Sequence, residues 1–203
     1  EVRPTIGIWT TLTPDHLERH GSIDAYRDIK KGLLQRSEHA VLNADDADLW
    51  SRHAHWPDAQ WVSSAPTKRE PSNLEIWINQ DGFVCNKKSA LFPADALPMP
   101  GEHNRQNMLL VTAAALQAGL TPETIERGLR SFPGVPHRLE SLGILHGMDV
   151  FNDSKATNYD AAAVALQAVP GPIALLAGGL SKQGDASGWL QLLHDRVCSI
   201  TLF

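Results

Sequence analysis

Hydrophobic residues follow two alternating periods along the chain. Short apolar runs bounded by polar residues are typical of buried strands, and they occur at residues 5–9, 40–43, 173–177 and 198–203. Between them, apolar residues recur at the helical period of about 3.6, at residues 22–36, 101–118, 160–169 and 189–194. Strands that alternate with helices predict an α/β fold built on a mainly parallel sheet.

Three stretches depart from this alternation. Short strand-like pieces at residues 61–62, 75–78 and 82–85 are separated by prolines and Asp81-Gly82, which predicts small antiparallel elements at a domain edge. Residues 91–100 contain three prolines, and we expect a connecting segment there. The pattern at residues 139–145 and 148–151 predicts a hairpin-like pair of strands. The second of them precedes a polar loop and an alanine-rich helix, so we also expect it to be a buried parallel strand.

The break at residues 132–136, Phe-Pro-Gly-Val-Pro, predicts a domain boundary, with one domain at residues 1–135 and another at 136–203. The chain begins without methionine and ends in an apolar run. We therefore expect a piece of a longer protein.

Composition narrows the class of protein. The hydrophobic share of 42% and charged share of 20% are those of a soluble globular chain, and the net charge of −5 gives no basic footprint for nucleic acid. We find no apolar run of membrane-spanning length. Cys85 and Cys198 lack metal-like spacing, which indicates reduced core residues of a cytoplasmic protein.

The loop at residues 152–158 is the strongest candidate site. It offers carboxylate, ammonium, hydroxyl and amide groups directly after a predicted strand. One interpretation is an ordinary polar loop with a helix cap. The density of groups suited to anions and a ribose favours a ligand site at the carboxyl end of the strand.

A second candidate is Lys30 on the predicted helix at residues 22–36. At 100° per residue, the apolar residues of this helix form one stripe that includes Lys30, whereas Lys31 points away; the stripe consists of Ile23, Tyr26, Ile29, Leu33 and Leu34. A lysine in such a place either extends its ammonium to solvent or loses its charge. A neutral amine can react with carbon dioxide to give a carbamate, which is an oxygen ligand for Mg²⁺.

Two smaller patterns remain open on the residues alone. Asp15-His16 follows a strand and is either structural or a metal or phosphate contact. Asn104 and Asn107 share a face in the first turn of a helix, where asparagines serve as caps or read an adenine edge.

Five motifs together resemble the Mur ligase family, in the order in which that family has them. They are Asp15-His16, Tyr26-Arg27-Asp28-Ile29-Lys30, the Gly-x-His-Asn-x-x-Asn run from Gly101 to Asn107, His137-Arg138-Leu139-Glu140, and Asn152-Asp153-Ser154-Lys155-Ala156-Thr157-Asn158. The resemblance spans nearly the whole chain. It implies an α/β fold made of part of a Mur-ligase central ATPase-like domain followed by part of a Rossmann-like C-terminal domain.

The resemblance also implies roles for single residues. His16 would contact Mg²⁺ or substrate, and Lys30 would be carbamylated. The remaining implied contacts are ATP contacts at Asn104, Asn107, Arg138 and Asp153, and contacts to the incoming glutamate at Lys155, Thr157 and Lys182.

The implied activity is ATP-dependent amide-bond formation, which adds D-glutamate to UDP-N-acetylmuramoyl-L-alanine through an acyl phosphate, in a protein that is monomeric at full length. Another ligase of the Mur or folate-polyglutamate type is the alternative, and a non-catalytic nucleotide-binding module is a third. No Gly-x-x-x-x-Gly-Lys-[Ser/Thr] phosphate loop occurs in these 203 residues. We expect it upstream, and we expect these residues alone to be inactive.

Overall fold

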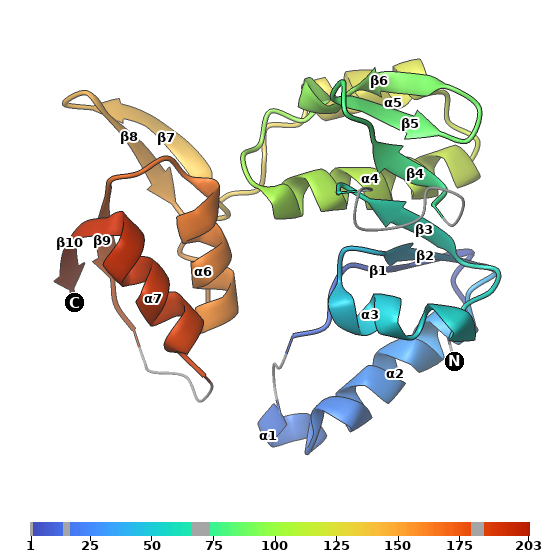
Figure 1. Cartoon of the computed structure of the whole chain (residues 1–203), viewed down its shortest axis with the longest axis horizontal. Coiled ribbons are helices and arrows are strands. Elements are labelled where there is room, and N and C mark those ends of the chain that lie inside the picture. The colour runs from blue at the N-terminus through green and yellow to red at the C-terminus, as the bar shows by residue number, and fades with distance from the viewer. Residues whose placement is uncertain (1, 14–16, 66–73, 180–184) are drawn as a thin grey trace. The chain divides into compact units, whose positions relative to one another are not determined.

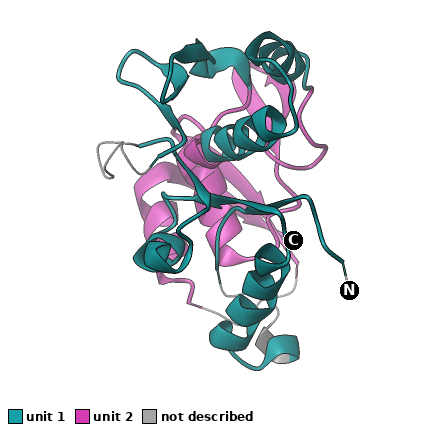
Figure 2. Cartoon of the chain, turned by 90° about the vertical axis from the view of Figure 1, so that its right-hand side faces the viewer, with its two compact units in different colours: residues 1–98, 104–132 teal, residues 99–103, 133–203 magenta. Residues whose placement is uncertain are grey.

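The computed structural model describes residues 2–13, 17–65, 74–179 and 185–203. Its contacts divide the chain into two compact units, shown in Figure 2. Unit 1 comprises residues 1–98 and 104–132, and unit 2 comprises residues 99–103 and 133–203. We describe each unit by itself. No helix of the described residues combines the length and the apolar character needed to cross a membrane.

Unit 1 is built on a six-stranded sheet in which the strands are neighbours in chain order. Strands β1 to β4 pair in parallel, whereas β4–β5 and β5–β6 are antiparallel. The strands are β1 (Ile6–Trp9), β2 (His39–Asn43), β3 (Gln60–Ser63), β4 (Ile76–Ile78), β5 (Phe83–Asn86) and β6 (Ala90–Pro93).

Successive side chains of a strand point to opposite faces of the sheet, and they pack in two separate cores. Val41 and Val62 pack in one core with the helices α4 (Glu102–Gln117) and α5 (Pro122–Arg130). Their neighbours Leu42 and Trp61 pack in the other, with α2 (Ile23–Gln35) and α3 (Ala47–Ser51). Figure 1 shows the helices on both sides of the sheet, which is how parallel strands are shielded from water. A short helix, α1 (Leu17–His20), precedes α2, and single 3₁₀ turns follow α3 and β6 at His53–His55 and Ala94–Ala96.

Two helices of unit 1 begin at a hydroxyl side chain that caps the first turn. The Ser22 side chain accepts a hydrogen bond from the Ala25 amide at 3.1 Å and so begins α2. Thr121 caps α5 in the same way, with Pro122 at its first position. In both cases a hydroxyl satisfies an amide that has no partner inside its helix.

The predicted apolar stripe of α2 is confirmed at Ile23, Tyr26 and Leu34 and wrong at Ile29 and Leu33. Ile29 and Leu33 are 59% and 40% exposed, whereas Leu34 is 4% exposed. Lys30 and Lys31 are both half-buried, so Lys31 does not lie on a separate solvated face. The predicted helix is present, but the face of α2 that packs on the sheet contains Arg27 and Lys31 and does not contain Ile29.

The edge of the sheet also differs from expectation. The predicted connecting segment at residues 91–100 begins with β6, the edge strand, which pairs with β5. The antiparallel pairing predicted for the short strands holds for β4 with β5, but β3 pairs with β4 in parallel. Pro93 is tolerated in β6 because an edge strand leaves one row of amides unpaired.

Unit 2 contains two small sheets and two helices. The strands β7 (Glu140–Leu145) and β8 (Met148–Asn152) form the predicted hairpin. The strands β9 (Ile173–Ala177) and β10 (Val197–Leu202) pair in parallel, and α7 (Ser187–Arg196) lies between them in the chain. The helix α6 (Tyr159–Ala168) packs on α7 through Tyr159 and Trp189, whose ring centroids are 5.6 Å apart.

Two predictions fail in unit 2. The strand β8 is neither parallel nor fully buried, because it pairs antiparallel with β7 and lies in a different sheet from β9. Cys198 is exposed, whereas Cys85 is a core residue as predicted.

The two phenylalanines of the β5–β6 pair give a test of the core of unit 1. Phe92 is 2% exposed and Phe83 is 39% exposed. Phe92→Ala should lower the free energy of unfolding by about 3–5 kcal/mol, because it removes a buried ring and leaves a cavity. Phe83→Ala, the matched control, should cost clearly less. Urea unfolding of both variants measures the difference, and equal losses would contradict this assignment of the core.

Candidate functional site

The carboxyl ends of β1, β2 and β3 are joined by one polar network in unit 1. The Asn43 amide donates to the Thr10 carbonyl at 3.0 Å and to Gln106 Oε1 on α4 at 3.2 Å, while its oxygen accepts from the Asp45 amide. The Asp45 carboxylate accepts from the Ser63 hydroxyl at 2.6 Å and from Ser64. Asn43 is 3% exposed and Ser63 is fully buried, so these hydrogen bonds offset the cost of burying polar groups.

The next residue, Asp46, connects the segment after β1 to α3. Its carboxylate accepts from the Thr11 hydroxyl at 2.6 Å, from the Leu12 amide at 3.0 Å and from the Leu49 amide at 2.9 Å. The last of these bonds is the N-cap of α3. One side chain therefore starts a helix and holds the strand end that leads toward Asp15-His16.

An arginine–carboxylate pair joins α2 to α3. Arg27 Nε and Nη2 donate to the two oxygens of Asp48 at 3.0 and 2.8 Å, and Arg27 also contacts Asp24. The Arg27 side chain is only 14% exposed. The Asp48 hydrogen bonds raise the pKa of Arg27, with smaller contributions from Asp24. A bidentate pair of this kind fixes the relative orientation of the two side chains as well as their separation.

Lys30 lies one turn after Arg27 on α2. Its Nζ lies 4.8 Å from the centroid of the Tyr26 ring, and that ring stacks on His20 at 5.0 Å. A cation over an aromatic face is a favourable contact for the ammonium form. This contact places Lys30 but does not test whether it is carbamylated, which stays a prediction. His16 lies outside the described residues.

No group of three or more His, Cys, Asp or Glu side chains within the described ranges is arranged to hold a metal ion. Asp45 and Asp46, the carboxylates at the end of β2, each accept from three protein groups. Lys30 as a carbamate would add an oxygen donor of the type that Mg²⁺ prefers. Lys30 fits such an ion only as a carbamate, since its ammonium form has no lone pair to offer.

The two candidate asparagines both lie near the start of α4. Asn104 is 6% exposed, whereas Asn107 is exposed. Their spacing of three residues puts them on neighbouring positions of one face. The two side chains therefore lie at different depths on that face.

In unit 2, hydrogen bonds join the loop at residues 137–139 to the loop at residues 152–156. The Leu139 amide donates to Asp153 Oδ1 at 3.0 Å, the Lys155 amide donates to the His137 carbonyl at 3.1 Å, and the side chains of Asn152 and His137 meet at 2.8 Å. His137 and Leu139 have φ angles of 66° and 43°. Non-glycine residues seldom adopt this left-handed backbone, and the bonds to the second loop hold it.

The electrostatics of this unit centre on Asp153 and His103. Burial raises the pKa of Asp153, opposed by the Leu139 amide and by the charges of His103 and Arg138. Burial also lowers the pKa of His103, and the negative charge of Asp153 opposes that change. Nδ1 of His103 is buried without a hydrogen-bond partner among the described residues. Perturbed groups of this kind gather at functional sites more often than elsewhere.

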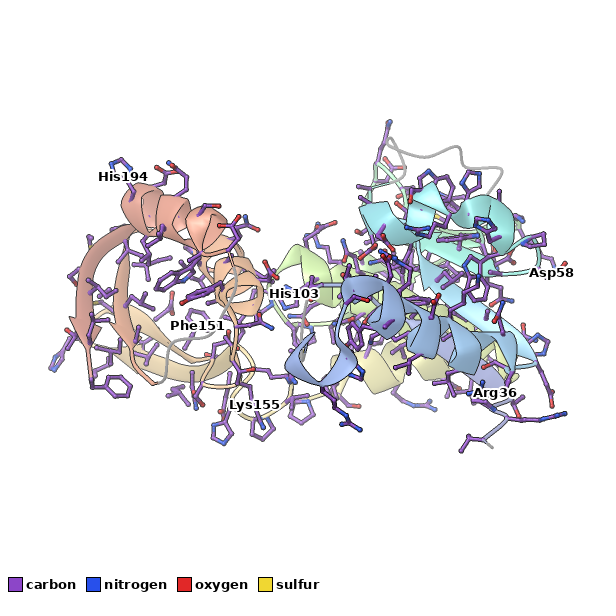
Figure 3. All side chains as sticks on the ribbon, turned by 90° about the horizontal axis from the view of Figure 1, so that it is seen from below. Arg36, Asp58, His103, Phe151, Lys155 and His194 are labelled. Atoms are coloured by element: carbon purple, nitrogen blue, oxygen red, sulfur yellow. The ribbon has the colours of Figure 1, made fainter. Side chains whose placement is uncertain are left out.

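The place of His103 depends on Gly101. A Cβ at Gly101, whose φ is 99°, would lie 2.7 Å from His103 Cε1 and 2.9 Å from the Ala168 Cβ. Both contacts are closer than real side chains allow, so only glycine leaves room for the ring. Figure 3 labels His103 together with Phe151 and Lys155 of the same unit.

The structure places three of the candidate residues on these two loops. Arg138 lies between the two strained residues, and Asp153 and Lys155 lie on the other loop. Thr157 is exposed just before Asn158, the cap of α6. Lys182 lies outside the described residues. Lys155 and Thr157 follow β8, and Lys182 comes after β9 in the sequence. We would expect all three to meet at the edge of one sheet, but β8 and β9 belong to different sheets.

The candidate site also contains residues that the sequence did not single out. His137, Glu140 and Asn152 bond to one another across the two loops, and His103 faces Asp153. All four residues belong to motifs named above, but nothing in the spacing of the motifs predicts which of these residues meet.

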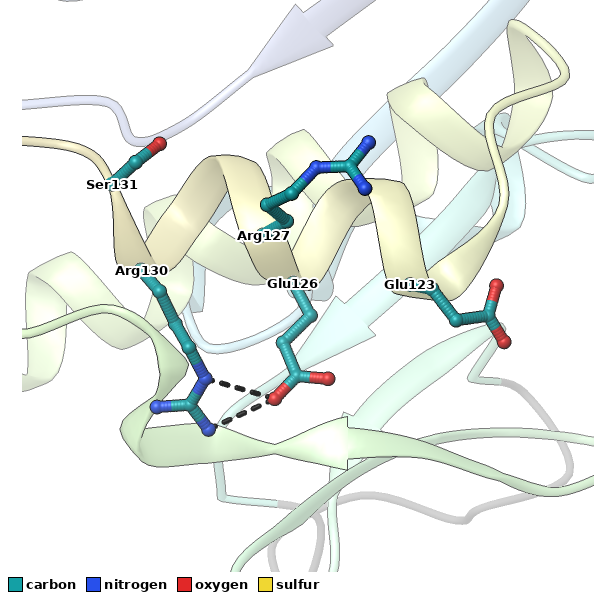
Figure 4. A pocket seen from close by; sticks show the side chains of 5 residues that line it. All are labelled: Glu123, Glu126, Arg127, Arg130 and Ser131. Carbon is teal, nitrogen blue, oxygen red and sulfur yellow. Dashed lines mark hydrogen bonds and ion pairs between the residues drawn. The ribbon is translucent and has the colours of Figure 1, made fainter.

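A separate hollow lies along α5 in unit 1. Figure 4 shows its lining, with Arg130 paired to Glu126 at 2.9 Å. The other lining residues are Glu123, Arg127 and Ser131. Pairs four residues apart on an exposed helix are common and weak. The hollow gives no reason to place a ligand there.

The raised pKa of Asp153 predicts a pH-dependent stability. The native state holds the Asp153 proton more tightly than the unfolded chain, so stability is greatest below the ordinary aspartate pKa and is lost as pH rises through the raised value. Asp153→Asn keeps an oxygen for the Leu139 amide without a buried charge. It should therefore have a higher free energy of unfolding than the parent at neutral pH, and the gap should close in acid.

Urea unfolding at the two pH values measures this gap. Asp149→Asn, on an exposed position of β8, is the control. The assignment fails if Asp153→Asn is no more stable than the parent at neutral pH, or if the control gains as much.

Comparisons with known proteins give the family. The Mur ligase middle domain matches residues 1–115, more than half of the chain. The chain is 60% identical to the UDP-N-acetylmuramoylalanine–D-glutamate ligase of Parasynechococcus marenigrum (strain WH8102) and 62% identical to that of Synechococcus sp. (strain CC9605), in each case across 100% of this chain and 44% of the relative. It thus spans less than half the length of these curated relatives.

Solved structures show the same fold at low identity. The UDP-N-acetylmuramate-alanine ligase MurC from Thermotoga maritima matches with a TM-score of 0.71 at 20% identity, over 98% of this chain and 46% of that one. An FPGS complex with AMPPCP and folate matches with a TM-score of 0.70 at 20% identity, over 99% and 51%. The Mur ligase middle domain matches residues 1–115, and the curated relatives align along the whole chain. The chain therefore belongs to the Mur ligase family.

Proposed function

We propose that this chain is part of an ATP-dependent amide ligase that adds D-glutamate to UDP-N-acetylmuramoyl-L-alanine in the synthesis of peptidoglycan precursors. The observation that supports this most is the identity of 60–62% over the whole chain with ligases named for that reaction. The loop at residues 152–158 supports it from the residues, since it is the stretch by which the chain resembles the glutamate-adding member of the family.

ATP is the proposed co-substrate. Two structural neighbours were solved with AMPPCP or with ADP. On this chain, Asn104 and Asn107 would contact the nucleotide from α4, and Arg138 and Asp153 from the two loops of unit 2. An arginine suits a phosphate or a base plane, because its guanidinium is flat and permanently charged.

The reaction divides into two displacements. A carboxylate oxygen of UDP-N-acetylmuramoyl-L-alanine attacks the γ-phosphorus of ATP, and ADP leaves. The amine of D-glutamate, after losing a proton, attacks the acyl carbon, and inorganic phosphate leaves. Lys155, Thr157 and Lys182 would bind the carboxylates of D-glutamate, and His16 and Lys30 would hold Mg²⁺. Bound Mg²⁺ would supply charge stabilisation for the transferred phosphoryl group.

An exchange of amino acids separates this proposal from its rivals. The longer protein that contains this segment should join D-glutamate, and no other amino acid, to the acceptor when ATP is present. A preference for L-alanine, a diamino acid or a folate substrate would assign another ligase of the family. Nucleotide binding without product from any amino acid would support a non-catalytic module. Labelled amino acid recovered in the UDP-linked product is the measurement.

Lys30 gives the sharpest test of the metal assignment. In the longer protein, Lys30→Ala should lower kcat/KM by about 100-fold or more, because a metal ligand is lost. Added acetate or formate should restore part of the activity. Lys30→Arg should fail and should not be rescued, because arginine keeps its positive charge.

Lys88→Ala, at an exposed position far along the chain from Lys30, is the control and should be active. Lys31→Ala is not a suitable control, because Lys31 is half-buried like Lys30. Full activity of Lys30→Arg would rule out the carbamate. Labelled carbon dioxide incorporated at Lys30, observed by ¹³C NMR, is a readout independent of turnover.

A separate substitution tests glutamate recognition. Lys182→Ala in the longer protein should raise the KM for D-glutamate by about ten-fold or more, since a charge-assisted contact contributes roughly 1.5–3 kcal/mol. The KM for ATP should change little. Initial rates with each substrate varied in turn distinguish the two, and an unchanged KM for D-glutamate would remove Lys182 from the site.

A further inference from the structure

The Asn152 side chain lies at the centre of a small hydrogen-bond cluster in unit 2. Its Oδ1 accepts from the Ser154 amide at 3.1 Å. Its Nδ2 lies 3.3 Å from Glu140 Oε2 and 2.8 Å from His137 Nδ1. The same Glu140 oxygen accepts from the His137 amide at 2.8 Å. All of these residues lie on or beside the hairpin of β7 and β8.

These neighbours fix which way the Asn152 amide faces. A backbone amide can only donate, so the atom of Asn152 beside Ser154 is its oxygen. A carboxylate oxygen can only accept, so the atom beside Glu140 is the nitrogen. Turning the amide over would place two donors together at Ser154 and two acceptors together at Glu140. Two independent contacts therefore agree on the orientation.

The orientation of Asn152 determines the hydrogen on His137. The Asn152 nitrogen has hydrogens and no lone pair to offer, so Nδ1 of His137 accepts from it. The neutral imidazole must then have its hydrogen on Nε2. The His137 side chain is 57% exposed, and no hydrogen bond within the described residues reaches Nε2.

We propose that Asn152 and Glu140 are positioning residues that lock His137 in the Nε2–H form, so that the exposed side of its ring presents a hydrogen-bond donor. In this form Nε2 cannot act as a general base, because its lone pair is committed to the ring and its hydrogen points outward. The backbone of His137, with its φ of 66°, is held by the Glu140 contact and by the Lys155 amide. Ring position and ring hydrogen are thus set by the same few contacts.

The chain supplies its own comparison for this proposal. His194 Nδ1 lies 3.0 Å from the Asp195 carboxylate, which can only accept. When its ring is neutral, His194 should favour the Nδ1–H form. His146, in the turn between β7 and β8, is exposed and serves as the reference histidine.

NMR of the ¹⁵N-histidine-labelled chain tests the proposal, at a pH high enough that the ring signals no longer change. Long-range ¹H–¹⁵N correlations distinguish a nitrogen with a hydrogen from one without. The His137 signals are assigned by their loss in His137→Gln. We expect the Nε2–H pattern for His137, at a higher fraction than for His146, and a shift toward Nδ1–H for His194.

An unconstrained imidazole already favours Nε2–H, so finding that form in the parent does not by itself show the effect of Asn152. Asn152→Asp is the decisive test. The new carboxylate accepts where the amide donated, so His137 should change to Nδ1–H. Asn158→Asp, which keeps an equally good cap on α6, should leave His137 unchanged. Asn152→Ala is a second variant: it removes the donor to Nδ1 and leaves Glu140 Oε2, 3.7 Å from Nδ1, in place, so the Nε2–H fraction should fall to that of His146 or below. The proposal is overturned if His137 is Nδ1–H in the parent, or if it stays Nε2–H to the same extent in both Asn152→Asp and Asn152→Ala.

Discussion

Burial of both faces of the parallel strands is the constraint on which unit 1 depends. Val41 and Leu42 are adjacent on β2, both fully buried, and belong to different cores. Such a strand is stable only when helices cover both faces, and α2 with α3 on one side and α4 with α5 on the other provide that cover. The loops at the carboxyl ends of β1 to β3 are then left as the place where polar side chains can gather. Asn43, Asp45 and Asp46 lie there because the strands end there.

Unit 2 is organised differently, by backbone contacts between two loops. The segments at residues 137–139 and 152–156 are joined by hydrogen bonds that use backbone amides as well as side chains. Such contacts hold unusual φ angles at His137 and Leu139 that the residues themselves disfavour. The cost of that conformation is offset locally, and the same contacts fix the position of the His137 ring.

Much of the fold could be predicted from sequence, because period and capping are local properties. The helix starts at Ser22 and Thr121, the hairpin of β7 and β8, and the α/β alternation all follow from neighbours within a few residues. The side of α2 that packs inward could not be predicted, since it depends on where β1 and β2 lie. The pairing of Arg27 with Asp48, 21 residues away, was invisible for the same reason. Lys155 and Asp153 were found through a motif, whereas the link from Asn152 to His137, 15 residues apart, exists only in three dimensions.

Asp46 shows what one shared acceptor does to motion. Because Thr11, Leu12 and Leu49 all donate to this carboxylate, the segment after β1 and the first turn of α3 cannot move independently without breaking a hydrogen bond. Arg27 and Asp48 extend the coupling from α3 to α2, where Lys30 lies. Thermal fluctuations of these three segments should therefore be correlated. A displacement of any one of them should also change the position of Lys30. The protein obtains rigidity around that lysine from two carboxylates on one short helix and its cap.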